Sequence, residues 1–393
     1  MKIVVLGPCS VESFLPSGRT QNLDEDHRFS GSTYICQEYI RQGHTVSIVR
    51  LSKHVSEKTE WNISGGGKVV LVPRRTQGSQ LIRDMWKSER RALASAVCEL
   101  NSDVLHANWT YEYALAMFET EMPYLLTAHD VPSRIFGMMK PRWYWWPRLY
   151  MGWRNGIKAK RLTSVSPYAV QCWQGEMGRK GPTDMIPNSV PESMIQLGDL
   201  PRSRTERQKN ESPVFVSVAN GFAGRKNTQT LVRAFALVRK VYPTASLLLI
   251  GAGHGTGEIA EKWSKARGLT DGVQFIGSLP KHDELLTLLH QRADVLVHAA
   301  LEESFGMTVV EAQALGIPVI GGQAAGAVPW LLDGGLGGTL CDVTSDEALS
   351  LAMKNVIRSF NSHQIAYARL RLRTAFSQER VGGMYLESLQ RSL

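Results

Sequence analysis

Residues 293–318 have the sequence ADVLVHAALEESFGMTVVEAQALGIP, which predicts a strand, a turn and a helix in succession. The apolar run 295–298 has no helical spacing and is typical of a strand buried in a parallel sheet. We expect the helix to begin near Ser304, whose hydroxyl can accept hydrogen bonds from free backbone amides, and to end at Gly316, with Pro318 just beyond. Such a unit presents backbone N–H groups and positive dipole charge at the carboxyl edge of the sheet, so it can bind an anion.

Two carboxylates belong to this unit, with seven residues between them. Glu303 is in the predicted turn, where it can accept hydrogen bonds from hydroxyls lying over the turn. Glu311 follows roughly two helical turns further in and can accept hydrogen bonds from a second group of hydroxyls. The pair predicts a ligand that carries hydroxyls as well as an anionic group. Ordinary surface charges at a helix start are the alternative.

This segment resembles the signature of the retaining glycosyltransferases of family four. In that family Glu, seven residues and Glu are followed by a Gly-x-Pro-Val strand, which here is residues 316–320. The resemblance covers nearly the whole chain and implies an α/β fold of two Rossmann-like domains facing across a cleft, the GT-B architecture. It also implies that Glu303 contacts the donor sugar and that Glu311 contacts the ribose of the nucleotide.

The resemblance extends the donor site to two further groups of residues in the second half. The turn between the carboxylates, Ser304, Phe305 and Gly306, is expected to lie beside the nucleotide-diphosphate sugar. Arg225 and Lys226 fall at a predicted helix start, where a basic pair and the helix dipole can together neutralise a diphosphate. Family members carry a Lys at the position of Lys226 and an Arg a few residues earlier, so Arg225 is expected to supply the second charge. Solvated surface positions are the alternative for both.

The first half opens with a strand, a long connection over residues 8–32, a helix and a second strand. A connection of this length is typical of a functional loop. Gly31 and Ser32 come just before the helix, where family members usually carry a glycine pair near the donor phosphates. Here Ser32 replaces the second glycine, and a turn glycine without a ligand is the alternative.

Strands that alternate with helices predict a parallel sheet, with ligands at the carboxyl ends of its strands. His129 and Asn108 both fall at such ends. The run 127–130 resembles the family's strand-end histidine, so His129 is expected to donate a hydrogen bond to a sugar hydroxyl or to the departing phosphate. His106 and Asn108 stand where the family often has two histidines and are candidates for lining the pocket. A structural role is the alternative for all three.

Residues 140–161, KPRWYWWPRLYMGWRNGIKAKR, contain seven basic residues and no acidic one, with four Trp and two Tyr among them. Indole and phenol rings favour the membrane interface, and each basic residue near an anionic leaflet adds about 1 kcal/mol. We therefore predict that this segment contacts an anionic membrane surface, which is consistent with a lipid-linked acceptor. Packing of the aromatic rings between helix and sheet is one alternative. Binding of single-stranded nucleic acid is another.

The length of 393 residues suits two domains. We predict an acceptor-binding domain over residues 1–195, a polar linker over 196–212 and a nucleotide-sugar-binding domain over 213–376. The remaining residues, 377–393, are expected to form a helix that crosses back to the first domain, as the last helix does in the family.

The composition narrows the class of protein. A net charge of +9 favours an anionic partner. The five cysteines are scattered and lack metal-ligand spacing, which predicts reduced thiols in a cytosolic protein and no zinc site. The sequence contains no apolar window of about 18 residues, so no transmembrane helix is expected. The opening run IVVLG is too short for a signal peptide and predicts a first strand.

The resemblance implies that the chain moves a sugar from a nucleotide-diphosphate sugar to a hydroxyl, with retention. The expected acceptors are lipid-linked glycans of bacterial surface-polysaccharide assembly. No cofactor is expected beyond the nucleotide sugar as co-substrate. The only Asp-x-Asp, from Asp24 to Asp26, lies in the long first loop and not at a strand end, so no catalytic metal is expected. We expect a cytoplasmic protein, peripheral on the inner face of the membrane, without nucleic acid as a partner. A nucleotide-sugar epimerase or phosphorylase of the same fold remains open, as does a non-catalytic adaptor for membrane or nucleic acid.

Overall fold

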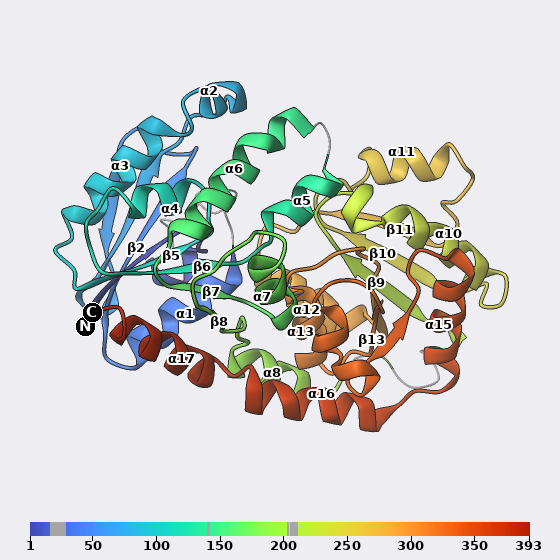
Figure 1. Cartoon of the computed structure of the whole chain (residues 1–393). Coiled ribbons are helices and arrows are strands. Elements are labelled where there is room, and N and C mark those ends of the chain that lie inside the picture. Colours follow the sequence, from blue (N-terminus) through green and yellow to red (C-terminus); the bar gives the residue numbers. More distant parts are fainter. Residues whose placement is uncertain (16–28, 140–141, 203, 205–210) are drawn as a thin grey trace. The chain divides into compact units, whose positions relative to one another are not determined.

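The computed structural model describes residues 1–15, 29–139, 142–202, 204 and 211–393. They form two compact units, one of Met1–Ser189 with Gln378–Leu393 and the other of Val190–Ser377. Each unit is built around its own sheet, in which strands alternate with helices along the chain (Figure 1). The expected α/β class with two parallel sheets is therefore confirmed.

The first unit has an eight-stranded sheet in the order β3-β4-β2-β1-β5-β6-β7-β8. Only β3 pairs antiparallel, with β4, among the described strands. The strands are β1 (Lys2–Leu6), β2 (Thr45–Ser52), β3 (Thr59–Asn62), β4 (Lys68–Pro73), β5 (Val104–Asn108), β6 (Tyr124–Ala128), β7 (Leu162–Ser164) and β8 (Thr183–Met185). The helices are α1 (Ser30–Arg41), α2 (Gly78–Arg83), α3 (Lys87–Cys98), α4 (Glu112–Met117), α5 (Pro132–Met138), α6 (Arg142–Lys158), α7 (Pro167–Gln174) and α17 (Gln378–Gln390).

Both faces of this sheet are buried, because successive side chains of a strand point to opposite faces. In β1, Ile3 and Val5 pack into a core with residues of α1 and α17. Val4 and Leu6 pack into a second core with residues of α3, α4 and α7. This explains why the strand is apolar at consecutive positions instead of alternating with polar residues.

Helix α17 packs against α1 in the first unit, although the whole second unit separates them in sequence. Its Val381, Tyr385 and Leu389 are buried in the core on that side. A Cβ added at Gly382 would come 2.3 Å from Cγ of Glu38. The close approach of the two helices therefore requires a glycine at this position.

The second unit has a six-stranded sheet, all parallel, in the order β11-β10-β9-β12-β13-β14. Its strands are β9 (Val214–Val218), β10 (Ser246–Ile250), β11 (Val273–Gly277), β12 (Val295–His298), β13 (Val319–Gly322) and β14 (Thr339–Cys341). Its helices are α8 (Glu192–Asp199), α10 (Thr228–Arg239), α11 (Ile259–Lys265), α12 (His282–Arg292), α13 (Met307–Ala314), α14 (Val328–Leu331), α15 (Asp346–Arg358) and α16 (Ser362–Ala375).

Helix α13, which belongs to the stretch 293–318, begins three residues later than predicted. Gly306 is its N-cap, with φ of 109°, and no side chain caps the helix. Ser304 does not act as the cap, because its hydroxyl donates to Oε1 of Glu302 at 3.4 Å. The left-handed turn at Gly306 is what delays the helix start. At the other end Gly316, with φ of 69°, follows the helix as expected.

Helix α8 occupies the start of the stretch predicted as a linker. It belongs to the second unit, where Arg369 Nη1 donates to the carbonyl of Gly198 at 2.7 Å and Nη2 to that of Ile195 at 2.9 Å. The division between the units thus falls after Ser189, earlier than the predicted residue 195. Residues 203 and 205–210 of the predicted linker lie outside the described residues.

Candidate functional site

The basic pair of the second unit lies in a turn between β9 and α10, in a short 3-10 helix, Gly224–Lys226. Asn227 follows with φ of 52°. Its side-chain Nδ2 donates to the backbone carbonyls of Ala299 at 3.1 Å and Val343 at 2.8 Å. The amide of Leu301 donates to the carbonyl of Arg225 at 2.8 Å. These bonds hold the basic turn against the loops that follow β12 and β14.

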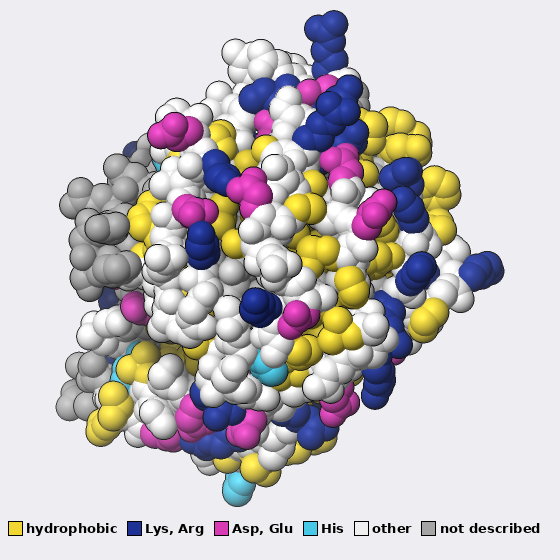
Figure 2. All heavy atoms as spheres, turned by 90° about the vertical axis from the view of Figure 1, so that its left-hand side faces the viewer, with side chains coloured by type: hydrophobic (Ala, Val, Ile, Leu, Met, Phe, Trp, Pro, Cys, Tyr) yellow, Lys and Arg dark blue, Asp and Glu magenta, His cyan; other side chains and the backbone are white. Residues whose placement is uncertain are grey.

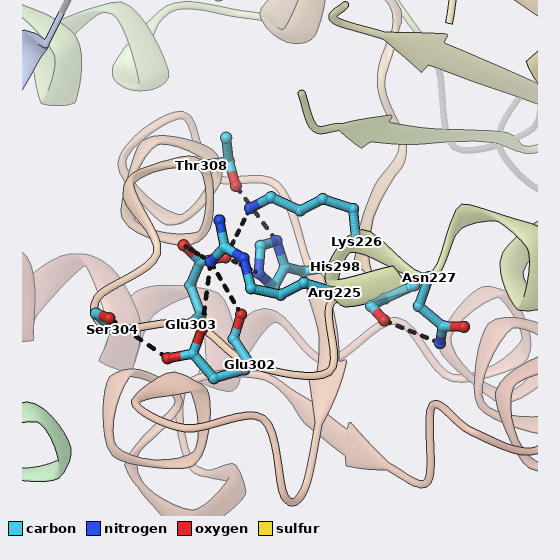
Figure 3. Close-up of polar contacts among 9 residues, drawn as sticks. Arg225, Lys226, Asn227, His298, Glu302, Glu303, Ser304 and Thr308 are labelled. Carbon is cyan, nitrogen blue, oxygen red and sulfur yellow. Dashed lines mark hydrogen bonds and ion pairs between the residues drawn. The ribbon is translucent and has the colours of Figure 1, made fainter. Parts of the chain in front are cut away.

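Lys226 and Glu303 form the centre of this site (Figure 3). Lys226 Nζ lies 2.9 Å from Glu303 Oε2, and His298 Nε2 lies 3.5 Å from the same oxygen. Burial alone would raise the pKa of Glu303, but Lys226, His298 and Arg225 together outweigh it and hold that pKa far below its usual value. The carboxylate is therefore ionised at neutral pH and can accept hydrogen bonds from hydroxyls.

Arg225 contacts both carboxylates of the turn (Figure 3). Its Nη1 lies 3.3 Å from Oε2 of Glu302 and 3.8 Å from Oε1 of Glu303. Burial raises the pKa of Glu302, and the charge of Glu303 adds to the rise, whereas Arg225 opposes it. Sequence reasoning missed Glu302 and His298. The available signals were a second acid next to Glu303 and a histidine at the carboxyl end of a predicted strand.

Glu311 lies in α13 and is contacted by a different residue. Its carboxyl group is buried, and its Oε1 lies 3.4 Å from Nε2 of His282, the first residue of α12. Burial raises the pKa of Glu311, and His282 opposes the rise. The structure therefore gives the two predicted carboxylates separate partners, Lys226 for Glu303 and His282 for Glu311.

The three residues between the carboxylates have different environments. The Phe305 ring is buried and packs edge-on against Trp330 and Phe376, with ring centroids 6.1 Å apart in both pairs. Its side chain therefore belongs to the core of the unit, and only its backbone can meet a ligand. Ser304 bonds to Glu302, and Gly306 provides the bend before α13.

In the first unit, His129 and Asn108 meet at the carboxyl ends of β6 and β5. His129 Nε2 donates to Oδ1 of Asn108 at 2.8 Å. Burial, with a smaller contribution from His106, lowers the pKa of His129 to about 3, and Asn188 opposes the shift. The imidazole is therefore neutral at pH 7. Because its N–H is used on Asn108, its Nδ1 offers an acceptor to a hydroxyl, whereas the sequence suggested a donor.

His106 is a core residue and does not line a pocket, which agrees with the structural role that the sequence left open. It is fully buried, and its ring nitrogens lie 3.1 Å from the Tyr39 hydroxyl and 2.8 Å from the Thr127 hydroxyl. Burial lowers its pKa to about 3. Two hydrogen bonds thus satisfy the polar atoms of this histidine on an inner strand.

Gly31 and Ser32 lie in the first turn of α1. A Cβ at Gly31 would come 2.8 Å from the Phe29 ring and 3.1 Å from Oδ1 of Asn188. The close packing of these neighbours explains the glycine. Ser32 is fully buried, and its hydroxyl has no hydrogen-bond partner among the described residues.

Trp109, which sequence reasoning did not single out, lies beside His129. It has φ of 75°, and its ring centroid is 5.7 Å from that of His129 and 5.8 Å from that of Phe29. The only signal in the sequence was an aromatic residue directly after a predicted strand end.

Within the described part of the chain, no group of three or more His, Cys, Asp and Glu residues is placed to hold a metal ion. Asp24 and Asp26 lie outside that part. Nor do the described residues include a helix long and apolar enough to cross a membrane.

Two family models match the chain. Residues 32–193 match Glycosyltransferase Family 4, and residues 201–371 match Glycosyl transferases group 1. N-acetyl-alpha-D-glucosaminyl L-malate synthase of Bacillus anthracis is 27% identical over 277 residues, 66% of this chain and 69% of that protein. A GDP-mannose-dependent alpha-(1-6)-phosphatidylinositol monomannoside mannosyltransferase of Mycolicibacterium smegmatis is 27% identical over 213 residues, 52% of this chain and 54% of that protein.

Solved structures share the fold over the full length. Sucrose-phosphate synthase from Thermosynechococcus elongatus has a TM-score of 0.77 at 18% identity, covering 100% of this chain and 98% of that one. HepE from Anabaena, in complex with UDP and glucose, has a TM-score of 0.68 at 17% identity and covers 100% of both chains.

Proposed function

The chain belongs to the family-four glycosyltransferases of the GT-B fold, and we propose that it moves a sugar from a nucleotide-diphosphate sugar to a hydroxyl, with retention and without a metal. The observation that carries this proposal is the bond between Lys226 and Glu303 at 2.9 Å. It places a cation for a diphosphate beside an ionised carboxylate for hydroxyls. A nucleotide sugar carries both groups, and solved structures of HepE contain UDP or UDP-glucose.

The second unit supplies the donor site in this proposal. Lys226 and Arg225 offset the negative charge that grows on the diphosphate as its bond to the sugar breaks. Glu303 accepts hydrogen bonds from the sugar hydroxyls, and Glu311 accepts them from the ribose. His282, 3.4 Å from Glu311, orients that carboxyl group.

The reaction needs no group beyond the two substrates. The bond between the anomeric carbon and the diphosphate oxygen breaks, and a bond to the acceptor oxygen forms on the same face of the sugar. The proton of the acceptor hydroxyl passes to the departing phosphate oxygen, so that a glycoside and a nucleoside diphosphate leave. His129, neutral at pH 7, can accept a hydrogen bond from a hydroxyl of a bound substrate.

Helix α6 supports the further proposal of contact with an anionic membrane surface. Four of its apolar side chains are exposed at intervals of four, three and four residues and so share one face of the helix: Trp146 (60%), Tyr150 (46%), Trp153 (45%) and Ile157 (41%). On another side, Arg148 pairs with Glu112 at 3.3 Å. The four exposed side chains therefore do not pack inside the unit, and aromatic rings beside basic residues suit a lipid interface.

The exposed aromatic face of α6 also bears on the class of acceptor. Figure 2 shows one face of the protein, on which hydrophobic side chains are exposed beside both basic and acidic ones. The structure does not describe the side chains of residues 142–144. A lipid-linked glycan in surface-polysaccharide assembly, used at the inner face of the membrane, fits an enzyme that rests on the lipid.

Thermal unfolding with UDP, GDP, ADP and dTDP tests the donor site. A diphosphate at about 100 times its dissociation constant should stabilise the protein by about 2.7 kcal/mol. Glu311→Ala should reduce the stabilisation, whereas Glu347→Ala, at an exposed position of α15, should leave it intact. Absence of stabilisation by all four nucleotides would contradict the proposal. Once a donor is known, NMR of the anomeric proton in the product decides whether configuration is retained.

A further inference from the structure

We infer that the first unit holds a subsite for the ring of an uncharged, polyhydroxylated acceptor, such as a pyranose or a cyclitol, on the indole of Trp109. The inference rests on the proposed function, because it names the class of acceptor. Its basis is the conformation of Trp109, the rings around it and the polar atoms of Asn108, Trp109 and His129 at the ends of the adjacent strands β5 and β6.

Trp109 is held in a backbone conformation that bulky residues rarely adopt. Its φ is 75°, directly after β5, and its N–H donates to the carbonyl of Thr127 at 2.9 Å. Such outliers cost about 1–3 kcal/mol and persist where the surrounding structure fixes them, often at binding sites. Hence the fold maintains a strained residue in order to hold an indole beside His129.

Other aromatic rings fix the indole in place. Phe29 meets it edge-on at 5.8 Å between ring centroids, and Tyr111 stacks at 6.4 Å with an interplanar angle of 29°. The Trp109 side chain nevertheless remains partly exposed. A partly exposed, rigid ring can stack against the C–H face of a sugar or cyclitol with little loss of side-chain entropy.

The polar atoms around the indole match hydroxyl groups. Among the described residues, three of them have no hydrogen-bond partner although they are buried: Nε1 of Trp109, Nδ2 of Asn108 and Nδ1 of His129. The first two can only donate, whereas Nδ1 of His129 can only accept, because Nε2 of that ring donates to Asn108. A buried polar group without a partner is unfavourable, and a bound hydroxyl would relieve that cost.

This mixture of donors and acceptors selects the chemistry of the ligand. A hydroxyl both donates and accepts, so neighbouring hydroxyls on one ring can serve Trp109 and His129 together. A carboxylate or phosphate only accepts and leaves Nδ1 of His129 unserved. None of Asn108, Trp109 and His129 carries a charge at pH 7, so an anion gains no ion pair from them.

Saturation-transfer NMR on the full chain tests the subsite with three cyclic probes, methyl α-glucopyranoside, methyl α-mannopyranoside and myo-inositol, and two open-chain controls, glycerol and L-malate. Ring protons of at least one cyclic probe should receive saturation, and the controls should not. Trp109→Ala should weaken binding about tenfold. Trp109→Phe keeps a ring but removes the N–H donor, so it should retain part of the binding. Tyr367→Ala, at an exposed aromatic position of α16 in the second unit, is the matched control and should bind as the wild type does.

Two sets of results would overturn the inference. One is the absence of saturation transfer to every cyclic probe, or transfer to the open-chain controls alone. The other is equal binding by Trp109→Ala and wild type, with folding of the variant verified by its thermal transition. Nucleotide binding distinguishes failure of the subsite from failure of the proposed function. If a diphosphate stabilises the wild type and Trp109→Ala equally while no cyclic probe binds, only the subsite is refuted.

Discussion

Nζ of Lys226 lies 2.9 Å from Oε2 of Glu303, so the cation proposed to bind a diphosphate and the carboxylate proposed to bind a sugar neutralise each other. Arg225 and Glu302 form a second pair beside them at 3.3 Å. The site is therefore nearly balanced in charge, and a diphosphate that binds must compete with carboxylates for the cations. Its affinity should depend on both pairs, which leads to the first prediction.

Lys226→Ala should weaken binding of the nucleoside diphosphate about 10- to 100-fold, because it removes a charge-assisted contact worth about 1.5–3 kcal/mol. Titration calorimetry with the diphosphate found in the thermal screen measures this change. Lys240→Ala, at an exposed position just after α10, is the matched control and should bind normally. Equal affinity in Lys226→Ala and Lys240→Ala would remove Lys226 from the site.

Glu311→Gln should stabilise the protein at neutral pH while weakening nucleotide binding about tenfold. Burial raises the pKa of Glu311 in the folded state. Between the unfolded and folded pKa values the unfolded state binds fewer protons, so the free energy of unfolding falls as pH rises through this window. Gln has no such penalty.

Urea unfolding at several pH values measures the effect of Glu311→Gln. The gain over the wild type should be present at pH 7 and should vanish below about pH 4, where Glu is protonated in both states. Glu347→Gln, an exposed position, should show no such dependence. A gain that does not change with pH would point to packing and not to the charge of Glu311.

His129→Gln should reduce the loss of stability in acid. The folded pKa of His129 is about 3, below the unfolded value of about 6.5, so the unfolded state binds the extra proton between these values and the free energy of unfolding falls as pH falls. At pH 5 this loss is about 2 kcal/mol for one histidine. His106, with a pKa of about 3, adds a similar loss that the variant retains.

Tryptophan fluorescence in urea at pH 7 and pH 5 is a suitable measurement, because eight of the ten tryptophans belong to the first unit, as His129 does. The control is His363→Gln, at an exposed position of α16. If the two variants lose the same stability on acidification, His129 is protonated in the folded protein and the neutral imidazole is refuted.

Replacing Trp146 and Trp153 by Ser should lower binding to vesicles that contain phosphatidylglycerol about tenfold or more. Sedimentation with these vesicles, compared with phosphatidylcholine alone, measures binding, which should also weaken at high salt. Leu351→Ser removes a similarly exposed apolar side chain, 54% exposed, from α15 and should bind as the wild type does. Unchanged binding by the double variant would exclude α6 as the contact.

The sequence predicts the strands well, because buried parallel strands are short, uninterrupted apolar runs. For β12 the predicted and observed bounds, residues 295–298, coincide. Between β4 and β5 the chain forms two helices, α2 and α3, and not one, because Met85 and Trp86 both have positive φ. No helical periodicity reveals such a break, which depends on packing around Trp86.

For the candidate site, the sequence indicated several of the residues but not which side chains contact one another. Glu303, Glu311 and Lys226 could be named from their spacing and resemblance, yet their partners depend on which loops the sheet brings together. His298 reaches Glu303 only because β12 ends beside the turn that carries it. Similarly, the orientation of the His129 ring depends on Asn108, 21 residues earlier on the adjacent strand.

The position of α17 also has a consequence for synthesis on the ribosome. The second unit is one continuous segment and can fold as it emerges, whereas the first unit lacks Val381, Tyr385 and Leu389 until the whole second unit has been translated. During that interval the apolar surface of α1 and β6 that α17 later covers is exposed. Nascent chains of this protein should therefore be clients of chaperones that hold hydrophobic surface until translation ends.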